Sequence, residues 1–538
     1  MSRVEEQSPS SAAADAGAGD VALPMAAPAR SPAARRVLVL GLGESGLAMA
    51  RWLAREGHAV EVADTRSAPP MLEELRAALP DVRLHAGALD AASLDGIDLL
   101  AISPGLSPRD EPLRSLIAEA DRRHIETVGE IELFARALEQ LRAQTGYAPQ
   151  VIGVTGTNGK TTTVRMAGRM IEEAGRSVLV AGNISPSALD ALRDAFDGKS
   201  LPEYWVLELS SFQLASTRSL ACAAAAVLNV TQDHLDWHAN FDEYRDCKRK
   251  IFARGTTRVV NRDDAESRAM GEREEGTISF GAGAPVAPGQ YGLVRDAGLA
   301  WLACIDPETA PRKRRRIART ALDAPPPPPV EAEPLHVQRF MPVEALSVRG
   351  THNALNALAA LALVRSAGIA LAPALRALAN FSGEPHRTET VATIAGVDYV
   401  DDSKGTNVGA TIAAIQGLAD GPDGRRPIVV ILGGDGKGQS FAPLADAVRA
   451  HARAAVLIGK DGPAIGAALE GTSVQLLPAA DLPAAVQTAA QIAQQGDIVL
   501  LSPACASFDA FRNYAHRAEV FIAAVRALAA GGAGGRVA

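Results

Sequence analysis

The sequence predicts an α/β protein made of three domains. Its 538 residues exceed what one hydrophobic core usually supports. Short apolar runs that end in glycine-rich turns alternate with segments of helical spacing, a pattern typical of parallel sheets covered by helices. The strongest runs begin at Arg36, Val151 and Ile428, far enough apart to belong to separate sheets. We therefore expect three α/β units in series.

Composition excludes several classes of protein. A net charge of -8 and a pI near 5.8 leave no broad basic surface for sequence-independent binding to nucleic acid. Four cysteines without paired spacing predict neither a zinc site nor a disulfide framework, and they favour a reducing cytoplasm. No apolar run has the length of a membrane span. Residues 1–35 are rich in Ser, Ala and Pro and carry acidic groups, so we expect a disordered tail and no signal peptide.

The first domain, residues 36–143, opens with a strand and a glycine-rich turn. Gly41, Gly43 and Gly46 form the G-x-G-x-x-G pattern of dinucleotide-binding turns, and the second strand ends at Asp64, which is placed to accept ribose hydroxyls. A later strand ends in Ser103–Gly105, which is either a simple turn or a ligand-binding strand end. No further nicotinamide-domain pattern follows. We expect a nucleotide-like ligand, either NAD or another.

The second domain, residues 144–379, opens with a phosphate-binding loop. A buried strand is predicted at Val151–Val154, and helical spacing starts at Thr161, so the glycine-rich turn lies at a helix N-terminus, which attracts anions. Lys160 can reach a terminal phosphate, and Thr161 can hold Mg²⁺. Val154 stands where the strict pattern has glycine. The loop is therefore a variant that predicts ATP, and a chance Gly-Lys-Thr is the alternative.

Polar residues follow the next strands and are candidate ligands. Glu208 ends an apolar strand, where a carboxylate belongs to a buried salt bridge or, beside a phosphate loop, to Mg²⁺. His234 suits a metal ion, a water or a hydrogen-bonded turn. By itself Lys248 belongs to a solvated basic helix face. Asn183, at another strand end, is a turn residue or a ligand contact.

Residues 281–346 show no regular pattern. The basic run Arg312–Arg316 and the prolines Pro325–Pro329 cannot build a core. We expect a long low-complexity surface loop, with a basic docking patch as the alternative. A strongly apolar helix follows, up to Ala367.

The third domain, residues 380–538, carries charged groups at its strand ends. Lys404 stands at a strand-to-helix turn, where its charge opposes the helix dipole, which favours an anionic ligand over simple capping. Lys437 follows another glycine-rich turn after a buried strand. Cys505 lies just after the last apolar strand and is expected to be structural.

Sequence motifs from Arg36 to the C-terminus, outside residues 281–346, resemble those of the Mur ligase family. They are TGTNGKTTT, ELSSFQL, NVTQDHLDWH, GTHNALNALAALAL, EPHR, DDSKGTNVGAT, LGGDGKG and SPACASFD. The resemblance implies a Rossmann-like N-terminal domain that binds UDP instead of NAD, a P-loop ATPase-like central domain and a Rossmann-like C-terminal domain that binds an amino acid. It also implies a cytoplasmic, monomeric peptide ligase that uses ATP and Mg²⁺ and needs neither nucleic acid nor a membrane span.

The resemblance also implies the roles of individual residues. The UDP substrate would contact Gly43, Ser45, Gly46, Asp64, Thr65, Ser103, Pro104, Gly105 and Asn183. ATP would contact Gly156, Thr157, Asn158, Gly159, Lys160, Thr161, Thr162, Asn353, Asn356, Arg387 and Asp402. Mg²⁺ would bind Thr161 and Glu208, and a second Mg²⁺ would bind His234 and a carbamylated Lys248. D-glutamate would contact Lys404, Thr406, Lys437, Ser507 and Phe508. The catalytic residues would be Lys160, His234, Lys248 and Lys404. Asn183 is followed by Ile-Ser-Pro where the family pattern has a second glycine, so contacts there are expected to differ.

The implied reaction joins D-glutamate to UDP-N-acetylmuramoyl-L-alanine through an acyl phosphate, a step of peptidoglycan precursor synthesis. Three alternatives remain at this point. They are a sister ligase with another acceptor, including folate polyglutamation, a nicotinamide oxidoreductase, and a non-catalytic nucleotide switch. Catalysis by a ligase would require domain closure, for which the connectors at residues 144–150 and 378–384 are the expected hinges.

Overall fold

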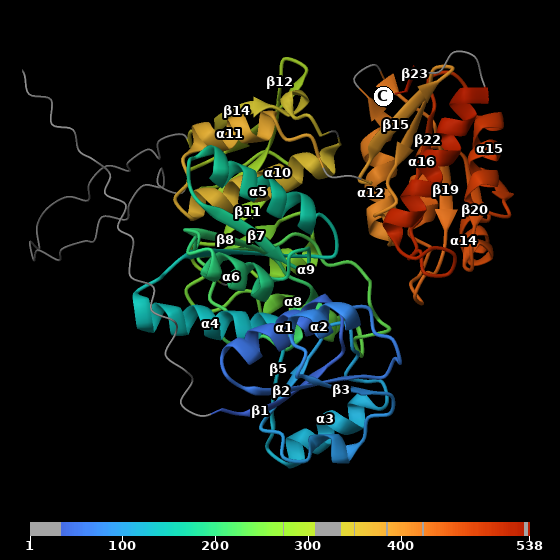
Figure 1. Cartoon of the computed structure of the whole chain (residues 1–538). Coiled ribbons are helices and arrows are strands. Elements are labelled where there is room, and N and C mark those ends of the chain that lie inside the picture. Colours follow the sequence, from blue (N-terminus) through green and yellow to red (C-terminus); the bar gives the residue numbers. More distant parts are fainter. Residues whose placement is uncertain are drawn as a thin grey trace, which may run out of the picture.

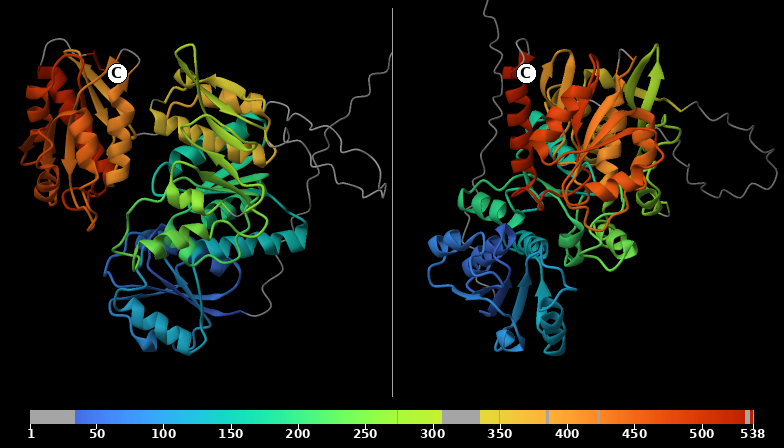
Figure 2. Two further views of the ribbon diagram at one scale, coloured as in Figure 1. Left: turned by 180° about the vertical axis from the view of Figure 1, so that it is seen from behind. Right: turned by 90° about the vertical axis from the view of Figure 1, so that its right-hand side faces the viewer.

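The computed structural model describes residues 34–272, 274–306, 335–348, 350–383, 386–421, 424–531 and 536–537. Three α/β bodies follow one another along the chain, each built on its own sheet (Figures 1 and 2). The predicted fold class is confirmed. The sheets lie within the predicted ranges 36–143, 144–379 and 380–538, whose exact borders stay a prediction, and residues 1–33 of the predicted tail lie outside the described residues.

The N-terminal body has a five-stranded parallel sheet in the order β3-β2-β1-β4-β5. Its strands are β1 (Arg36–Leu40), β2 (Ala59–Asp64), β3 (Arg83–Ala86), β4 (Leu99–Ile102) and β5 (Glu126–Val128). Its helices are α1 (Glu44–Arg55), α2 (Leu72–Ala78), η1 (Ala91–Leu94) and α3 (Leu113–Arg122). The chain reverses its direction across the sheet between β1 and β4, so the turns after these strands meet where such sheets usually bind ligands.

The middle body has a nine-stranded sheet in the order β14-β13-β12-β11-β10-β9-β6-β8-β7. Its strands are β6 (Gln150–Thr155), β7 (Val178–Gly182), β8 (Tyr204–Glu208), β9 (Ala224–Val227), β10 (Thr257–Asn261), β11 (Ile278–Phe280), β12 (Gln290–Asp296), β13 (Leu299–Cys304) and β14 (Gln338–Pro342). Its helices are α5 (Lys160–Glu173), α6 (Ala188–Asp197), α7 (Ser211–Ala215), α8 (Phe241–Arg249), α9 (Ala265–Ala269), η3 (Val343–Ala345), α10 (Thr351–Ser366) and α11 (Leu371–Ala379). β6 lies between β8 and β9, which brings the ends of all three strands together.

The prediction of a long surface loop at residues 281–346 is wrong for the residues of this range that the structure describes. β12, β13 and β14 pair antiparallel and extend the middle sheet. Tyr291, Leu302 and Cys304 are buried in the same core as the apolar helix α10. These strands are held by packing against a helix that follows them in the chain, a long-range contact that no local pattern reveals. Residues 307–334, with the basic run and the five prolines, lie outside the described residues.

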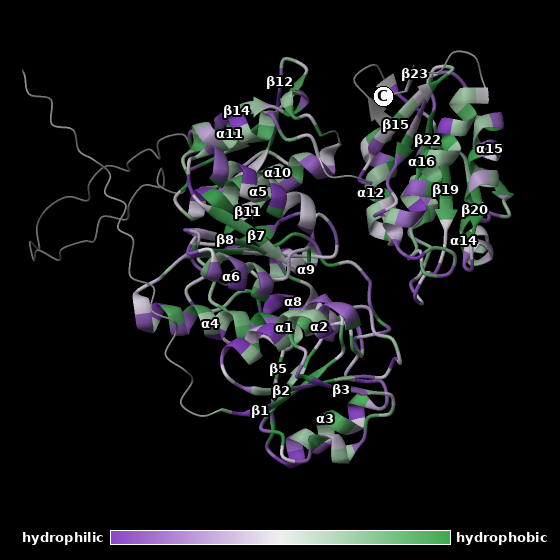
Figure 3. Cartoon of the chain, in the orientation of Figure 1, coloured by the Kyte–Doolittle hydropathy of each residue, from purple (hydrophilic) through white to green (hydrophobic). Residues whose placement is uncertain are grey.

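The C-terminal body has a seven-stranded sheet in the order β21-β20-β19-β22-β16-β15-β23 and a small two-stranded one. Its strands are β15 (Glu389–Ile394), β16 (Val397–Asp401), β17 (Asp420–Gly421), β18 (Gly424–Arg425), β19 (Ile428–Gly433), β20 (Ala452–Ile458), β21 (Gln475–Pro478), β22 (Ile498–Leu501) and β23 (Arg536–Val537). Its helices are α12 (Val408–Ala419), α13 (Leu444–His451), α14 (Gly462–Leu469), α15 (Leu482–Ile492) and α16 (Tyr514–Gly531). Its central strands β19 and β22 are apolar throughout, as fully buried parallel strands are (Figure 3).

The N-terminal and middle bodies are joined differently from the C-terminal body. The long helix α4 (Glu130–Thr145) runs along the border of the first two bodies and packs against α1 and α6 (Figure 1). Arg55 adds an ion pair with Asp197 at 2.5 Å and lies over the ring of Phe196. The C-terminal body instead meets the middle body through polar side chains beside α12 and α10. In the described part of the chain, no helix has the length and apolar character that a membrane crossing needs.

Replacing Gly46 by alanine is expected to distort the turn after β1. A Cβ at Gly46 would lie 1.8 Å from the carbonyl oxygen of Gly41, whereas one at Gly43 would meet nothing within 4 Å. Gly46→Ala should therefore lower the free energy of unfolding by about 2 kcal/mol, because the backbone of Gly41 must move. Gly43→Ala should change it by less than about 0.5 kcal/mol. Thermal and urea unfolding of both variants test this, and equal stabilities would contradict it.

Candidate active site

The first predicted ligand turn forms where β1 and β4 end side by side. Gly41 has a φ of +83°, which a side chain would strain. Its carbonyl oxygen accepts a hydrogen bond from Ser103 Oγ at 2.8 Å, which ties the two turns together. The predicted UDP contacts Gly43, Ser45 and Gly46 stand at the start of α1, and Pro104 and Gly105 follow Ser103. The geometry brings these six residues to one end of the sheet.

The carboxylate of Asp64 is already hydrogen-bonded within the protein. Its carboxylate accepts hydrogen bonds from the backbone N–H of Leu42 at 2.8 Å and from the guanidinium of Arg66 at 2.7 and 2.8 Å. Burial alone would raise the pKa of Asp64, but the bonds from Arg66 and Leu42 lower it to about 2. A ribose hydroxyl would have to compete with Arg66 for this carboxylate, whereas the neighbouring Thr65 is exposed.

The phosphate loop joins β6 to α5. Gly156 and Gly159 have φ angles of +151° and +84°, and a Cβ at Gly159 would lie 2.4 Å from Asn356 Oδ1. Lys160 Nζ donates to the carbonyl oxygens of Gly156 and Thr157, both at 2.9 Å. Burial lowers the pKa of Lys160. The first turn of α5 then directs unpaired backbone N–H groups toward the loop, as an anion site requires.

Glu208 ends β8, which pairs with β6, and Thr161 lies in the first turn of α5, the helix that follows β6. Glu208 is 3% exposed, its Oε1 accepts from Asn183 Nδ2 at 3.2 Å, and its Oε2 has no hydrogen-bond partner. A buried carboxylate oxygen without a donor fits a hard cation such as Mg²⁺ better than it fits the predicted salt bridge. Thr161 Oγ1 accepts long bonds from Arg387 at 3.2 Å and Lys404 at 3.5 Å, which a metal ion would displace.

Lys248 is buried and does not lie on the solvated basic helix face that its sequence context alone predicts. It is 2% exposed, its Nζ donates to the carbonyl oxygen of Gly156 at 2.8 Å and lies 4.5 Å from the centre of the Tyr244 ring. Burial first, and the charge of Lys160 second, hold the pKa of Lys248 well below its usual range. An uncharged amine is nucleophilic, so this lysine fits the chemistry of carbamate formation.

His234 faces the same group of side chains. Its ring packs edge-on against Phe212, with centroids 4.7 Å apart, and its Nε2 lies 3.6 Å from Asp233 Oδ2. Burial lowers the pKa of His234 to about 4. The imidazole is therefore neutral at neutral pH, which is the form that binds metal ions. His234 and Lys248 thus suit a second cation only after the lysine has gained an anionic oxygen.

A cavity of about 250 Å³ lies between the middle and C-terminal bodies. Asn353 and Asn356 of α10 line one side, and Arg387 and Asp402 line the other, so all four predicted contacts of the adenosine part come together. Gly159 and Thr162 of the phosphate loop line the same cavity. His352 Nδ1 also belongs to this wall and is buried without a hydrogen-bond partner. The cavity therefore offers the unused His352 Nδ1 next to the phosphate loop.

The turns of the C-terminal body meet at the ends of β16, β19 and β22. Asp435 and Ala506 exchange backbone hydrogen bonds at 3.0 and 2.8 Å, which place Lys437 beside the segment of Ser507 and Phe508. Lys404 lies 5.2 Å from the Tyr514 ring and points toward the phosphate loop, near Thr406. Ser507 is buried, but Phe508 is 73% exposed. The predicted D-glutamate contacts share one end of the sheet, while Phe508 is not enclosed in this structure.

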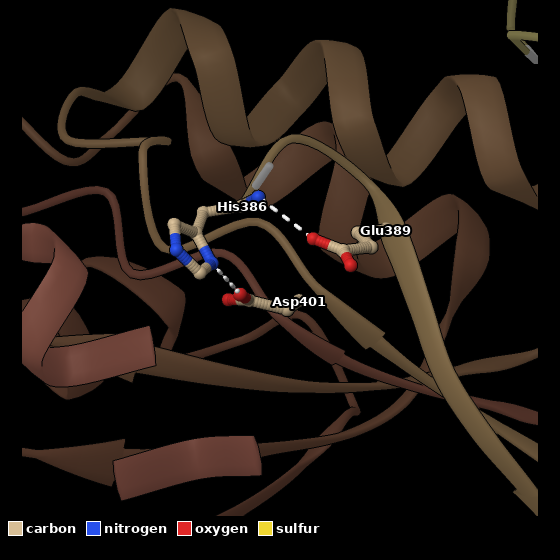
Figure 4. Close-up of side chains that lie close together, drawn as sticks. All are labelled: His386, Glu389 and Asp401. Atoms are coloured by element: carbon tan, nitrogen blue, oxygen red, sulfur yellow. Dashed lines mark hydrogen bonds and ion pairs between the residues drawn. The ribbon is translucent and has the colours of Figure 1, made fainter. Parts of the chain in front are cut away.

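A hydrogen-bonded cluster holds the turn that carries Arg387. His386 Nδ1 bonds to Asp401 Oδ2 at 2.8 Å, and the backbone N–H of His386 donates to Glu389 Oε2 at 2.9 Å (Figure 4). Asp401 Oδ1 also accepts from Ser403. These three side chains come from β15, β16 and the turn before them, so they fix the direction in which Arg387 leaves the C-terminal body.

Family comparisons match all three bodies. Residues 35–129 match the Mur ligase MurD-like N-terminal domain, residues 154–291 the Mur ligase middle domain, and residues 386–505 the Mur ligase glutamate ligase domain. The chain belongs to the Mur ligase family. The strands β1, β6, β8 and β16, whose ends carry candidate site residues, all end inside the matched segments of this Mur ligase.

Curated relatives and solved structures agree with this family. The UDP-N-acetylmuramoylalanine--D-glutamate ligases of Ralstonia nicotianae and Burkholderia pseudomallei are each 53% identical to this Mur ligase over 92% of it and 97% of their own length. The fold resembles UDP-N-acetylmuramate-alanine ligase MurC from Thermotoga maritima, with a TM-score of 0.54 at 20% identity over 92% of this chain and 100% of that one. It also resembles MurF from Acinetobacter baumannii, with a TM-score of 0.52 at 18% identity over 81% and 91%.

Three residues that bond to predicted site residues of this Mur ligase, Asn229, Asn407 and Arg66, are absent from the sequence-based prediction. Asn158 and Asn407 form a pair of amide bonds across the cleft at 3.1 and 3.0 Å. Asn229 Oδ1 accepts the backbone N–H of Asn158 at 2.7 Å and so shapes the phosphate loop. Both Asn229 and Asn407 stand in recognised motifs, NVTQDHLDWH and DDSKGTNVGAT, and that is the signal that could have found them. Arg66, the partner of Asp64, has no such signal.

Asp402→Asn is expected to flatten part of the pH dependence of stability. Burial raises the pKa of Asp402 to about 7, so the folded protein holds a proton there that the unfolded chain has lost. Stability from this group is present below about pH 4 and is lost as the pH rises toward 7. Between about pH 5 and pH 7.5, the wild type should therefore lose roughly 1–3 kcal/mol more than the variant. Urea unfolding without nucleotide measures the difference, and parallel pH profiles would contradict it.

Proposed function

We propose that this Mur ligase joins D-glutamate to UDP-N-acetylmuramoyl-L-alanine and uses ATP to do so, as a step of peptidoglycan precursor synthesis. The enzyme is an ATP-dependent peptide ligase of its family. The substrate assignment is supported by the names of relatives that are 53% identical over 92% of the chain. It is also supported by one arrangement: a nucleotide turn, a phosphate loop and lysine-bearing turns stand on three separate sheets. A nicotinamide oxidoreductase needs no phosphate loop, so that alternative is dropped.

ATP is expected to span the cleft between the middle and C-terminal bodies. The cavity beside Asn353 and Asn356 would take the adenosine part, and the turn from Gly156 to Thr162 would hold the phosphates. Lys160 would leave the carbonyl oxygens of its own loop for the terminal phosphate, which offers it a full negative charge. Arg387 already reaches the loop and would add a second cation.

The residues around the loop fit divalent cations. Thr161 and Glu208 would hold one Mg²⁺, and His234 with carbamylated Lys248 would hold a second. Bound there, Mg²⁺ would neutralise phosphate charge and orient the reacting groups. The carbamate forms when the uncharged amine of Lys248 adds to CO₂ and loses one proton. This reaction changes a buried amine into an anionic oxygen ligand.

The chemistry then follows in two balanced steps. The carboxylate of the L-alanyl group attacks the γ-phosphorus of ATP, forming an acyl phosphate and releasing ADP. The amine of D-glutamate attacks the acyl carbon, loses a proton, and expels phosphate from the tetrahedral intermediate. Lys160 and Arg387 would stabilise the charge that spreads over the phosphoryl oxygens. Lys404 and Lys437 would orient the carboxylates of D-glutamate.

The C-terminal body is the part that we expect to move. It reaches the phosphate loop through few polar contacts, and Phe508 remains exposed. The connector before β6 is tied down, because Tyr147 Oη donates to Pro202 O and accepts from Trp205 Nε1. Residues 378–383 are therefore the better hinge. We also expect action in the cytoplasm, where ATP and nucleotide-activated sugars occur, and a monomer, because one chain supplies every proposed site residue.

Phosphate release should require all four components at once. With ATP, Mg²⁺, UDP-N-acetylmuramoyl-L-alanine and D-glutamate, we expect turnover, because the acyl phosphate needs both a donor carboxylate and an acceptor amine. Leaving out any one component should abolish release above background. A phosphate assay with mass spectrometry of the nucleotide product measures this. Equal release with L-glutamate or L-lysine would contradict the acceptor, and ATP binding without phosphate release would indicate a non-catalytic switch.

Lys248→Ala should reduce kcat by more than about a hundredfold, because it removes a proposed metal ligand next to the reacting phosphates. The matched control is Lys250→Ala on the same helical segment. Lys250 donates only to the carbonyl oxygen of Ala215, so this variant should keep nearly full activity. Labelling with ¹³C-bicarbonate gives a readout without turnover, since a carbamate carbon signal should appear in the wild type and disappear in Lys248→Ala. A fully active Lys248→Ala enzyme would refute the carbamate.

A further inference from the structure

One buried carboxylate at the border of the N-terminal and middle bodies has no role in the mechanism above. Glu130 is the first residue of α4 and is 1% exposed. Burial raises the pKa of Glu130 to about 7, against the effect of the hydrogen bonds that it accepts. A buried carboxyl group is costly, so its surroundings must compensate for lost hydration. Its neighbours show what it connects.

Glu130 accepts hydrogen bonds from three segments. Its Oε2 accepts from Ser45 Oγ at 3.3 Å and from Gln213 Nε2 at 3.4 Å, and its Oε1 accepts from the backbone N–H of Leu189 at 3.1 Å. Ser45 is the second residue of α1, Leu189 the second of α6 and Gln213 the third of α7. The carboxylate thus lies among the N-terminal ends of four helices, α4 included, where positive ends of helix dipoles favour an anion.

Each of these segments begins beside a proposed ligand contact. Ser45 belongs to the turn proposed to hold the UDP substrate. The segment before α6 contains Asn183, which bonds to Glu208. Gln213 Oε1 accepts from the backbone N–H of Ser210 at 3.1 Å, which anchors the chain two residues after Glu208. A continuous path of hydrogen bonds and short backbone links therefore runs from Ser45 through Glu130 and Gln213 to the end of β8.

We propose that Glu130 is a positioning residue that holds the nucleotide turn of the N-terminal body in register with the end of β8, where Glu208 lies. This inference rests on the proposed function, because Ser45 is assigned there to the UDP substrate. The sugar nucleotide must place its L-alanyl carboxylate at the phosphate loop, on the other body. The reach of the sugar nucleotide is limited by its covalent structure, so the two bodies must stay within that reach of each other. Glu130 supplies a bonded link between them next to the ligand.

Glu132 is a natural comparison in the same helix. It is 2% exposed and lies about half a helical turn further along α4. Its hydrogen bonds also cross the border between the two bodies. Its carboxylate accepts from the backbone N–H groups of Arg218 and Ser219 at 2.8 and 2.9 Å and from Ser219 Oγ at 3.0 Å. These partners lie after α7, a further one, Arg136, lies one turn along α4 at 2.9 Å, and none belongs to the nucleotide turn. Glu132 therefore shares the burial and the bridging of Glu130 but not its contact with Ser45.

The test compares Glu130→Gln with Glu132→Gln. For Glu130→Gln we expect the KM and the calorimetric Kd for UDP-N-acetylmuramoyl-L-alanine to rise roughly tenfold, since a glutamine side chain has one acceptor oxygen where the carboxyl group uses two. The KM values for ATP and D-glutamate should stay within about twofold, because the phosphate loop and the C-terminal turns are untouched. Glu132→Gln should lose thermal stability to a similar degree while its KM values do not change.

Two further variants make the assignment specific. Ser45→Ala should weaken binding of the sugar nucleotide, and its effect in the double variant with Glu130→Gln should be less than the sum of the two single effects, because each single variant already loses the Ser45–Glu130 bond. Glu130→Asp keeps the charge on a shorter side chain and should recover part of the affinity, and it also serves if Glu130→Gln does not fold.

The outcomes separate the two claims. Normal substrate binding by Glu130→Gln, or equal losses in Glu130→Gln and Glu132→Gln, would overturn the positioning role while leaving the proposed function intact. Fully additive effects of Ser45→Ala and Glu130→Gln would overturn it as well. A wild-type enzyme that binds no UDP-N-acetylmuramoyl-L-alanine would instead overturn the proposed function, and this inference with it.

Discussion

Two lysine amines share one carbonyl oxygen of the phosphate loop. Lys160 and Lys248 both donate to Gly156 O, at 2.9 and 2.8 Å, inside the turn between β6 and α5. Burial lowers the pKa of both amines, and the charge of Lys160 lowers the pKa of Lys248 further. The turn therefore favours ligands that bring negative charge. Phosphates would meet this demand at Lys160, and conversion of Lys248 to a carbamate would place an anionic group at the second amine.

The arrangement of the three bodies follows from what each must hold. The N-terminal and middle bodies are joined by ion pairs, by the helix α4 and by the buried carboxylates Glu130 and Glu132. That connection suits a substrate that spans both bodies. The C-terminal body instead approaches through Asn407, Arg387 and other polar groups, which exchange partners at little cost. Such contacts suit a body that closes over ATP and an incoming amino acid and then opens again.

The motifs alone predict the three α/β units, the phosphate loop and the grouping of polar residues at strand ends, because these depend on local spacing and on the rule that parallel strands bind ligands at their carboxyl ends. The motifs do not predict features that depend on contacts between distant parts of the chain. The strands β12 to β14 depend on packing against α10, more than forty residues further along from β13, so their segment shows no pattern of its own. The ion pair of Asp64 with Arg66 depends on side-chain rotamers. The exposure of Phe508 depends on the position of the whole C-terminal body.

Lys248 shows most clearly which of its properties follow from the sequence and which from the tertiary structure. The family resemblance assigns it a function, yet the sequence offers two nearby lysines, Lys248 near the end of α8 and Lys250 just after it. The fold buries Lys248 on Gly156 O and leaves Lys250 on the surface. Sequence by itself determined which residue types stand after which strands, because local spacing sets the strands, turns and helices. Only the tertiary structure decided which of these groups lose their water, and loss of hydration is what sets their charge and reactivity.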